Sequence, residues 1–165
     1  MTQSDPQGRE LVLYVDRFDW DRWAPHLRPR TDDVRILCLA DEAVDSSAPI
    51  VGALFDLALQ VHVKPDWTLE QHLTRFDSWE RVYLAMLGAQ CVGYTYARAT
   101  DVAGLLQQGM TAVLPEHRRQ GIGLALKLAT IRHARQHSLN RIQTSNSSSR
   151  DAMIQLNLKL GYVDQ

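Results

Sequence analysis

The sequence predicts a mixed α/β domain. Short β-branched, apolar runs recur along the chain, and two helix-like stretches precede an antiparallel meander. A strand, helix and strand pattern then occupies the last third, and this order of elements is typical of mixed α/β folds. The 165 residues, 45% of them hydrophobic, are expected to form one domain that buries roughly 70% of its unfolded surface.

The first elements are irregular. Residues 11–15 (LVLYV) predict a strand, residues 19–33 a connecting segment rich in Trp, Arg and Pro, and residues 34–39 a second strand. Ser46 or Ser47 is expected to cap a helix, because the apolar residues after them share one helical face. These residues are Leu54, Leu57, Ala58 and Val61. Lys64-Pro65-Asp66 interrupts this helix.

The later elements are more strongly patterned. Residues 68–71 (TLEQ) form a capping box that predicts a helix to about Phe76. A hairpin turn at 88–90 should join strands 81–87 and 91–97. The remaining elements are expected as a strand at 105–114, a helix at 121–137, a strand at 141–145 and a helix at about 150–160.

Composition excludes several classes of function. The net charge of −1 argues against a protein that grips a nucleic-acid backbone, because such proteins carry a basic excess. The polar N-terminus lacks a signal-peptide pattern, and the most apolar window, 50–59, is too short to span a bilayer. Cys38 and Cys91 lie in apolar runs and are expected to be reduced. We therefore expect a cytoplasmic protein with no nucleic-acid or membrane partner.

Residues 118–123 (RRQGIG) are the most informative stretch for function. They lie between a strand that stops at Pro115 and a helix with an apolar stripe. Glycines at a helix start expose backbone N–H groups, which together with the helix dipole favour a phosphate or pyrophosphate. The absence of Gly-Lys-Ser/Thr excludes a P-loop, and the three-glycine spacing and acidic residue of a dinucleotide site are missing.

Downstream residues add a family resemblance. Arg-x-x-Gly-x-Gly at 118–123, followed by Asn146, Met153, Asn157 and Leu160-Gly161-Tyr162, resembles the GNAT superfamily of acyl-CoA-dependent N-acetyltransferases. The fit is closest to the mycothiol-synthase-like and tandem-domain branch, close over 110–162 and loose over 34–100. The resemblance implies a mixed, mostly antiparallel central sheet flanked by helices. It divides residues 1–165 into an N-terminal strand and connector (1–33), an acceptor-side half (34–100) and an acetyl-CoA-binding half (101–165).

The resemblance also implies roles for individual residues. The pyrophosphate of coenzyme A should lie on the amides from Arg119 to Leu124, with Arg118 beside it, and Asn146 should lie near the pantetheine arm. The backbone of the preceding strand should pair with that arm, and the Val113 N–H should stabilise the thioester oxyanion. The complete predicted cofactor set is Thr111, Ala112, Val113, Arg118, Arg119, Gln120, Gly121, Ile122, Gly123, Leu124 and Asn146.

Two residues depart from the family pattern. Many members carry a tyrosine where Asn157 stands, and that phenol protonates the leaving thiolate. Asn157 is the second predicted catalytic residue, positioning a water or the thioester sulfur, or it only bonds the helix backbone. Arg150 replaces an Asn common in this branch. The general base is left open among Glu80, Tyr83, Tyr94, Tyr96, Asp101 and His117.

The predicted function is therefore acetyl transfer from acetyl-CoA to a small-molecule or protein amine, and the alternative is a non-catalytic acyl-CoA sensor or partner module. No metal is predicted: His133 and His137 have the spacing of a helical pair but lack a third ligand nearby.

The family's closing strand is missing from its usual place after Tyr162. Residues 10–17 are therefore expected to supply it, within the chain or by strand exchange in a homodimer. The alternative is that this strand belongs to a lost neighbouring domain and that the sheet is simply short.

Overall fold

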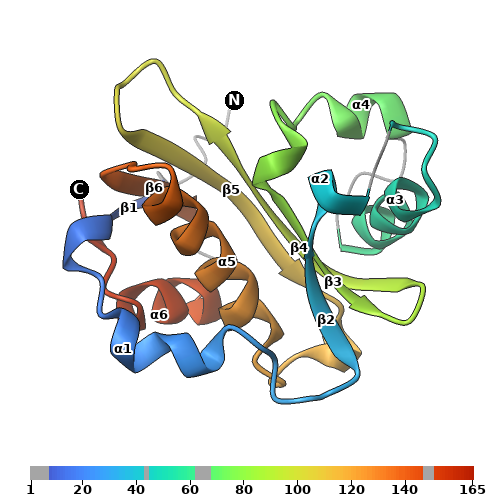
Figure 1. The fold of residues 1–165 in the computed structure, drawn as a ribbon, viewed down its shortest axis with the longest axis horizontal. Helices are drawn as coiled ribbons and strands as arrows, with labels where there is room; N and C mark the ends of the chain where they lie inside the picture. Colours follow the sequence, from blue (N-terminus) through green and yellow to red (C-terminus); the bar gives the residue numbers. More distant parts are fainter. Residues whose placement is uncertain (1–7, 43–44, 62–67, 147–150) are drawn as a thin grey trace, which may run out of the picture.

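A computed structural model describes residues 8–42, 45–61, 68–146 and 151–165. Its centre is a seven-stranded sheet in the order β2-β3-β4-β5-β6-β1-β7 (Figure 1). The strands are β1 (Arg9–Tyr14), β2 (Val34–Cys38), β3 (Val82–Leu87), β4 (Gln90–Ala99), β5 (Leu105–Val113), β6 (Arg141–Asn146) and β7 (Val163–Asp164). Every neighbouring pair is antiparallel except β5 and β6, which are parallel. The predicted fold class is confirmed.

Helices cover both faces of this sheet (Figure 1). They are α1 (Trp20–Trp23), α2 (Leu39–Glu42), α3 (Pro49–Val61), α4 (Leu69–Leu73), α5 (Ile122–Gln136) and α6 (Asp151–Lys159). Successive side chains along a strand point to opposite faces of the sheet, so neighbouring residues of β4 contact helices on different sides. Ile122 and Leu126 of α5 lie over Gly93, whereas the ring of Tyr94 contacts His72 of α4 on the opposite face.

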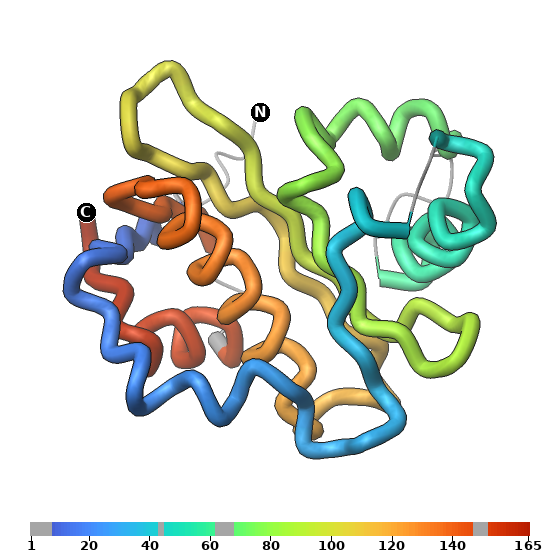
Figure 2. The backbone as a smooth tube through the Cα atoms, viewed as in Figure 1, coloured from blue at the N-terminus to red at the C-terminus, as the bar shows by residue number. Residues whose placement is uncertain are grey.

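The N-terminal strand completes the sheet from within the same chain. β1 pairs along its whole length with β6, from Arg9 opposite Asn146 to Tyr14 opposite Arg141, and it also pairs with β7. The N-terminal segment therefore runs beside the C-terminal one (Figure 2). Leu11 and Leu13 are fully buried in the core shared with α5 and Tyr162, so apolar burial holds β1 in place. The predicted closing strand is confirmed in its intrachain form, and strand exchange stays a prediction.

Several local predictions are confirmed. Thr68 and Gln71 form the reciprocal capping box at the start of α4. The β3–β4 hairpin turns at Gly88, whose φ of 59° suits glycine in a tight turn.

Other local predictions are wrong in detail. Ser47 does not cap α3; its N–H instead donates to the Asp45 carboxylate, and the helix begins at Pro49, a residue favoured at a first helical position. The expected strand ends early, because Val15–Arg17 form a 3-10 turn. Leu39 belongs to α2 rather than to β2, and α4 ends at Leu73, before Phe76. The segment predicted as a connector contains α1 and the 3-10 turn Ala24–His26.

Candidate functional site

The strands β5 and β6 part in the middle of the sheet. Their parallel pairing runs from Leu105 opposite Arg141 to Gln108 opposite Thr144 and stops there, although β5 continues to Val113. A bulge marks the point of separation, because Tyr96 of β4 faces both Gly109 and Met110. The Tyr96 ring lies directly over Gly109, where a Cβ would come within 2.3 Å of it. The bulge thus depends on glycine at this position.

Beyond the bulge, β5 presents a backbone edge to the gap. Leu114 N–H donates to Val92 C=O at 2.9 Å, and the register continues through Tyr94 opposite Ala112. Bonded and non-bonded pairs alternate in an antiparallel ladder, so the N–H and C=O groups of Thr111 and Val113 point away from β4. These two residues belong to the predicted cofactor strand. Their amides face the gap that β6 leaves.

The loop after β5 leads into the N-terminus of α5. Arg119 and Gly121 both adopt the left-handed conformation, with φ of 65° and 79°, and Gly121 is the N-cap of the helix. No side chain caps the helix at Gly121, so the first amides of α5 point out of the helix end without an intrahelical partner. Exposed amides at a helix N-terminus favour an anion. The structure therefore places the RRQGIG loop at the end of the open β5 edge.

Two contacts hold this loop. Arg30 N–H, from the N-terminal connector, donates to Gln120 C=O at 2.9 Å. The Arg118 Nε donates to Val113 C=O at 3.1 Å, which ties the loop to the end of β5. Arg118 was expected to add a donor beside the phosphate, and part of its donor capacity serves this brace instead. The loop and the strand edge consequently form one positioned unit.

Asn146 and Asn157 meet in the interior beside this unit. Asn157 is fully buried on α6, and its Nδ2 donates to Asn146 Oδ1 at 3.3 Å. The other polar atoms of the pair, Asn146 Nδ2 and Asn157 Oδ1, are buried without a hydrogen-bond partner among the described residues. An unsatisfied buried donor and acceptor are costly, and a ligand rich in amide groups would satisfy them. This observation fits the pantetheine arm of coenzyme A. Arg150 lies outside the described residues.

A second set of side chains lies under the bulge and is called the Gln108 network here. It consists of Thr95, Gln108, Thr111, Lys127 and Tyr162. Gln108 Oε1 accepts from Lys127 Nζ at 2.8 Å and from the Tyr162 hydroxyl at 3.0 Å, while its Nε2 lies 3.4 Å from Thr95 Oγ1. The hydroxyls of Thr95 and Thr111 are 2.8 Å apart. Burial lowers the pKa of Lys127 to about 7 and raises the pKa of Tyr162.

The gap between the strands is a cleft of about 490 Å³, called the β5–β6 cleft here. Because the two strands no longer pair here, residues from both sides of the sheet line the cleft, such as Arg75 beyond α4 and Lys127 of α5. Its lining residues are Arg75, Tyr96, Arg98, Gln107, Gln108, Gly109, Met110, Thr111, Lys127, Thr144, Ser145, Asn146 and Met153. The predicted residues Thr111 and Asn146 thus meet in one cleft.

Of the candidate general bases, only Tyr96 lines this cleft. Its hydroxyl accepts from Arg75 at 2.9 Å. Tyr83 faces His133 on the α5 side, and burial raises its pKa to about 12. The remaining candidates lie elsewhere: Tyr94 is fully buried beside His72, Glu80 and Asp101 are exposed, and His117 is in the 3-10 turn after β5.

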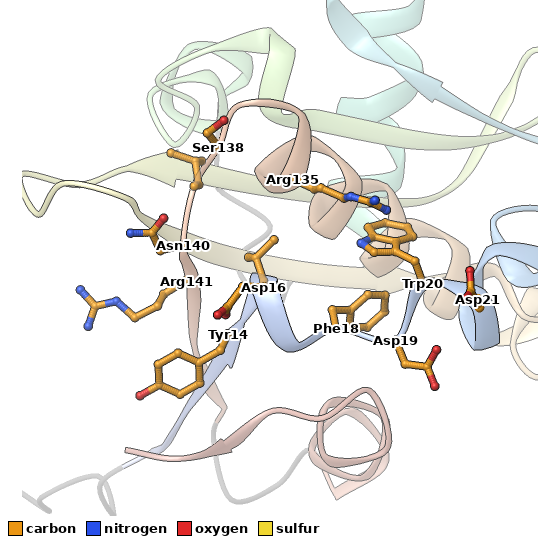
Figure 3. A pocket seen from close by; sticks show the side chains of 12 residues that line it. Tyr14, Asp16, Phe18, Asp19, Trp20, Asp21, Arg135, Ser138, Asn140 and Arg141 are labelled. Atoms are coloured by element: carbon orange, nitrogen blue, oxygen red, sulfur yellow. The ribbon is translucent and has the colours of Figure 1, made fainter.

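A larger hollow of about 990 Å³ lies at the opposite end of α5. Asp16, Asp19 and Asp21 lie along it, and the guanidinium of Arg135 stacks over Trp20 (Figure 3). Three carboxylates would repel the phosphates of an acyl-CoA. The β5–β6 cleft is therefore the better candidate, because it contains Thr111 and Asn146 of the predicted cofactor set and none of its described lining residues is acidic.

The described residues contain no group of three or more His, Cys, Asp or Glu side chains that could hold a metal ion. The rings of His133 and His137 stack at 4.1 Å, with the His137 Nδ1 2.9 Å from the His133 carbonyl. No helix within the described ranges is long and apolar enough to cross a membrane.

Comparison with known proteins identifies the family. The model of the Acetyltransferase (GNAT) family matches residues 51–162. The chain therefore belongs to the GNAT acetyltransferase family, whose general activity is N-acetyl transfer from acetyl-CoA. No curated protein matches the sequence. The family match does not distinguish the mycothiol-synthase-like branch, which stays a prediction.

Solved structures show the same fold. A tandem GNAT protein from the clavulanic acid biosynthesis pathway has a TM-score of 0.70 and 22% identity, covering 98% of this chain and 51% of that one. A GCN5-related N-acetyltransferase from Sphaerobacter thermophilus gives 0.68 and 18%, covering 97% and 50%. The ribosomal-protein-S18-alanine N-acetyltransferase from Escherichia coli gives 0.62 and 21%, covering 78% and 76%. The chain thus spans about half the length of the first two structures.

Sequence reasoning missed Gln108, Lys127 and the Tyr162 hydroxyl. One signal was available, because Lys127 interrupts the apolar run Leu124-Ala-Leu-Lys-Leu-Ala129 of a helix that is otherwise buried. A lysine in such a run either faces solvent because of its position on the helix, or is buried with a polar partner. Periodicity alone did not distinguish the two.

Proposed function

We propose that this protein transfers an acetyl group from acetyl-CoA to the primary amine of a small molecule or protein, directly, in a ternary complex. One observation carries the proposal. The backbone edge of β5, opened by the loss of β6 pairing after Gln108, leads directly to the uncapped N-terminus of α5. A ligand with an amide-containing arm and a pyrophosphate matches both parts in order.

In this proposal the pyrophosphate lies on the amides from Arg119 to Leu124, and the pantetheine arm pairs with β5 like an added strand. Thr111 supplies both of its backbone groups and Val113 its N–H, because the Val113 C=O already accepts from Arg118; the side chain of Ala112 packs into the sheet. Asn146 Nδ2 and Asn157 Oδ1 are the buried groups that the arm would satisfy. The thioester then lies at the β5–β6 cleft, where the acceptor enters past Arg75 and Tyr96.

The reaction forms one bond and breaks another. The neutral amine nitrogen attacks the thioester carbon, the C–S bond breaks, and the nitrogen's surplus proton ends on the coenzyme A sulfur. The Val113 N–H stabilises the oxyanion of the tetrahedral intermediate. Asn157 cannot act as the acid, because an amide does not donate a proton usefully, so positioning of the two substrates supplies much of the acceleration.

The test is thiol release from acetyl-CoA against a panel of amines, alongside calorimetric binding of coenzyme A. Acceptor-dependent release by at least one amine is expected. Coenzyme A that does not bind would overturn the site itself, independently of which acceptors were tried.

The alternative is a non-catalytic acyl-CoA-binding module. The amide at position 157, in the place of the family's tyrosine, favours it. Such a module would bind coenzyme A and release no thiol with any amine in the panel. The two outcomes separate the enzyme from the module.

A further inference from the structure

Lys127 is a buried lysine with no carboxylate partner among the described residues. It is 1% exposed, in the middle of α5, and its Nζ is bonded to the neutral amide oxygen of Gln108. A buried ammonium group is costly unless it is paired, and Met or Leu would fill the same space without this cost. The position therefore needs a reason other than packing.

The lysine nitrogen belongs to the same cleft as the proposed reaction. Lys127 lines the β5–β6 cleft together with Thr111 and Asn146. Gln108 occupies one N–H of the amine and so orients it. The Nζ also lies 5.4 Å from the centre of the Tyr162 ring. The hydrogens that point toward neither Gln108 nor this ring, or the lone pair of the neutral amine, are left for a group within the cleft.

Other charged and titratable groups face the cleft from each packed element. Arg75 and Tyr96 approach from the α4 side and Arg98 from the end of β4. Tyr162 is buried behind the lining, where it contacts Gln108 and Lys127. None of these is a carboxylate or a histidine, the groups that usually move protons near neutral pH. Burial lowers the pKa of Lys127 to about 7, so its two protonation states are comparably populated there.

We propose that Lys127 is the proton carrier of the transfer site, a role that rests on the proposed function. The neutral Nζ accepts a proton from the attacking amine as the C–N bond forms. The resulting ammonium then donates this proton to the coenzyme A thiolate as the C–S bond breaks. Lys127 returns to its neutral form, and the proton count balances without another reactant. The residue thereby supplies the acid that Asn157 does not.

The kinetic test compares Lys127→Met with the wild-type protein. Lys159→Met is the matched control, because Lys159 is an exposed residue of α6. The expected loss for Lys127→Met is on the order of 10²-fold to 10⁴-fold in turnover, with unchanged affinity for coenzyme A by calorimetry. The wild-type pH profile of kcat/KM should show a limb with a midpoint near pH 7 that the variant lacks.

Measuring the pH profile with two acceptors whose amines differ in pKa shows which group causes the limb near pH 7. A limb that belongs to the acceptor moves between them, whereas a limb that belongs to Lys127 stays. A Lys127→Met variant that keeps both the limb and wild-type turnover would overturn the proposal. So would acetylation of Lys127 on incubation with acetyl-CoA, seen as an acetylated Lys127 peptide, because an acetylated amine cannot carry a proton.

A second measurement needs neither an acceptor nor activity. The chain has three lysines, Lys64, Lys127 and Lys159, so carbon-13 labelling at lysine Cε gives a simple NMR spectrum that Lys127→Met assigns. The Lys127 signal should titrate near pH 7 and shift when coenzyme A binds. A midpoint above about pH 9, or no response to bound coenzyme A, would overturn the role of Lys127. If no amine is acetylated, the proposed function fails, and this titration still decides the place of Lys127 in the cleft.

Discussion

The segment from Gly109 to Leu124 and the Gln108 network both contribute to the β5–β6 cleft, the segment through Gly109–Thr111 and the network chiefly through Gln108 and Lys127, but they offer different chemical groups. The segment offers backbone amides, placed by a bulge, a parted strand and an uncapped helix start. The network offers side chains drawn from β4, β5, α5 and the end of the chain, joined by hydrogen bonds of 2.8 to 3.4 Å. The first region is suited to holding a cofactor. The second is suited to handling protons.

The largest effect is expected from removal of residues 1–18, which should disrupt the Gln108 network through the loss of β1. β1 pairs with β6 and β7, and its Leu11 and Leu13 are buried in the core beside Tyr162, so the deletion should remove support from the Gln108 network. We expect loss of cooperative thermal unfolding, because the chain loses several buried side chains worth about 2 kcal/mol each.

A truncated chain that stays soluble, monomeric and equally heat-stable would contradict this role of β1. Sedimentation of the full chain tests the strand-exchange prediction in parallel. An exchanged dimer would show a Tm that rises with protein concentration.

Gly123→Glu should impair coenzyme A binding by the segment from Gly109 to Leu124 and leave the Gln108 network unchanged. A carboxylate at the start of α5 would repel the pyrophosphate and cover the amides. A Cβ at this position would meet Val113 and Leu156 only at ordinary contact distance, 3.8 and 4.0 Å, so the first carbon of the new side chain fits. We expect coenzyme A affinity to fall by more than about a hundredfold, or ~3 kcal/mol, measured by calorimetry. The control is Gly52→Glu, since Gly52 is an exposed glycine of α3 at which an added Cβ would meet no described atom of another element within 4 Å. Equal affinity for coenzyme A in the two variants would contradict the assignment of the pyrophosphate site to the loop before α5.

Lys127→Met should change stability in the opposite direction from its effect on turnover. The pKa of Lys127 is about 7 in the folded chain and ordinarily 10.5, so the unfolded chain binds more protons between these values. Wild-type stability should therefore rise with pH from about 7 toward 10.5, by up to about 1.4 kcal/mol per pH unit. Lys127→Met should be more stable at pH 7 by on the order of 2 kcal/mol and should lack this slope.

Urea unfolding at pH 7, 8 and 9 measures both features of Lys127→Met. Lys159→Met serves again as the control. A wild-type slope that survives in Lys127→Met would show that another group causes it.

The smallest effect is expected for Asn157→Ala. It leaves Asn146 Oδ1 without its donor, so a stability loss of about 1–3 kcal/mol is expected from thermal unfolding. Turnover should fall by less than about a hundredfold, because Asn157 supplies no proton. A complete loss of turnover with intact coenzyme A binding would show that Asn157 is essential to the reaction and would contradict the assignment of the proton transfer to Lys127 alone.

The sequence by itself predicted the backbone elements that form the candidate site. Glycines before an apolar helix, a proline that ends a strand and the Leu-Gly-Tyr segment are local signals, because each reflects the φ and ψ that one residue needs. The capping box at Thr68 and the β3–β4 hairpin were predictable for the same reason. The apolar run at 11–15 predicted the strand that the structure places at Arg9–Tyr14, and its buried leucines explain why it joins the sheet.

Only the tertiary structure decided the rest. Gln108, Lys127 and Tyr162 are separated by up to 54 positions in the chain, and their roles depend on which side chains the packing of α5 and the chain end brings together. Burial sets the pKa of Lys127, and burial is a property of the assembled core rather than of a local pattern. That Tyr96, alone among the candidate bases, lines the cleft likewise depends on the parting of β5 and β6, because a strand separation involves residues that pair only at long range.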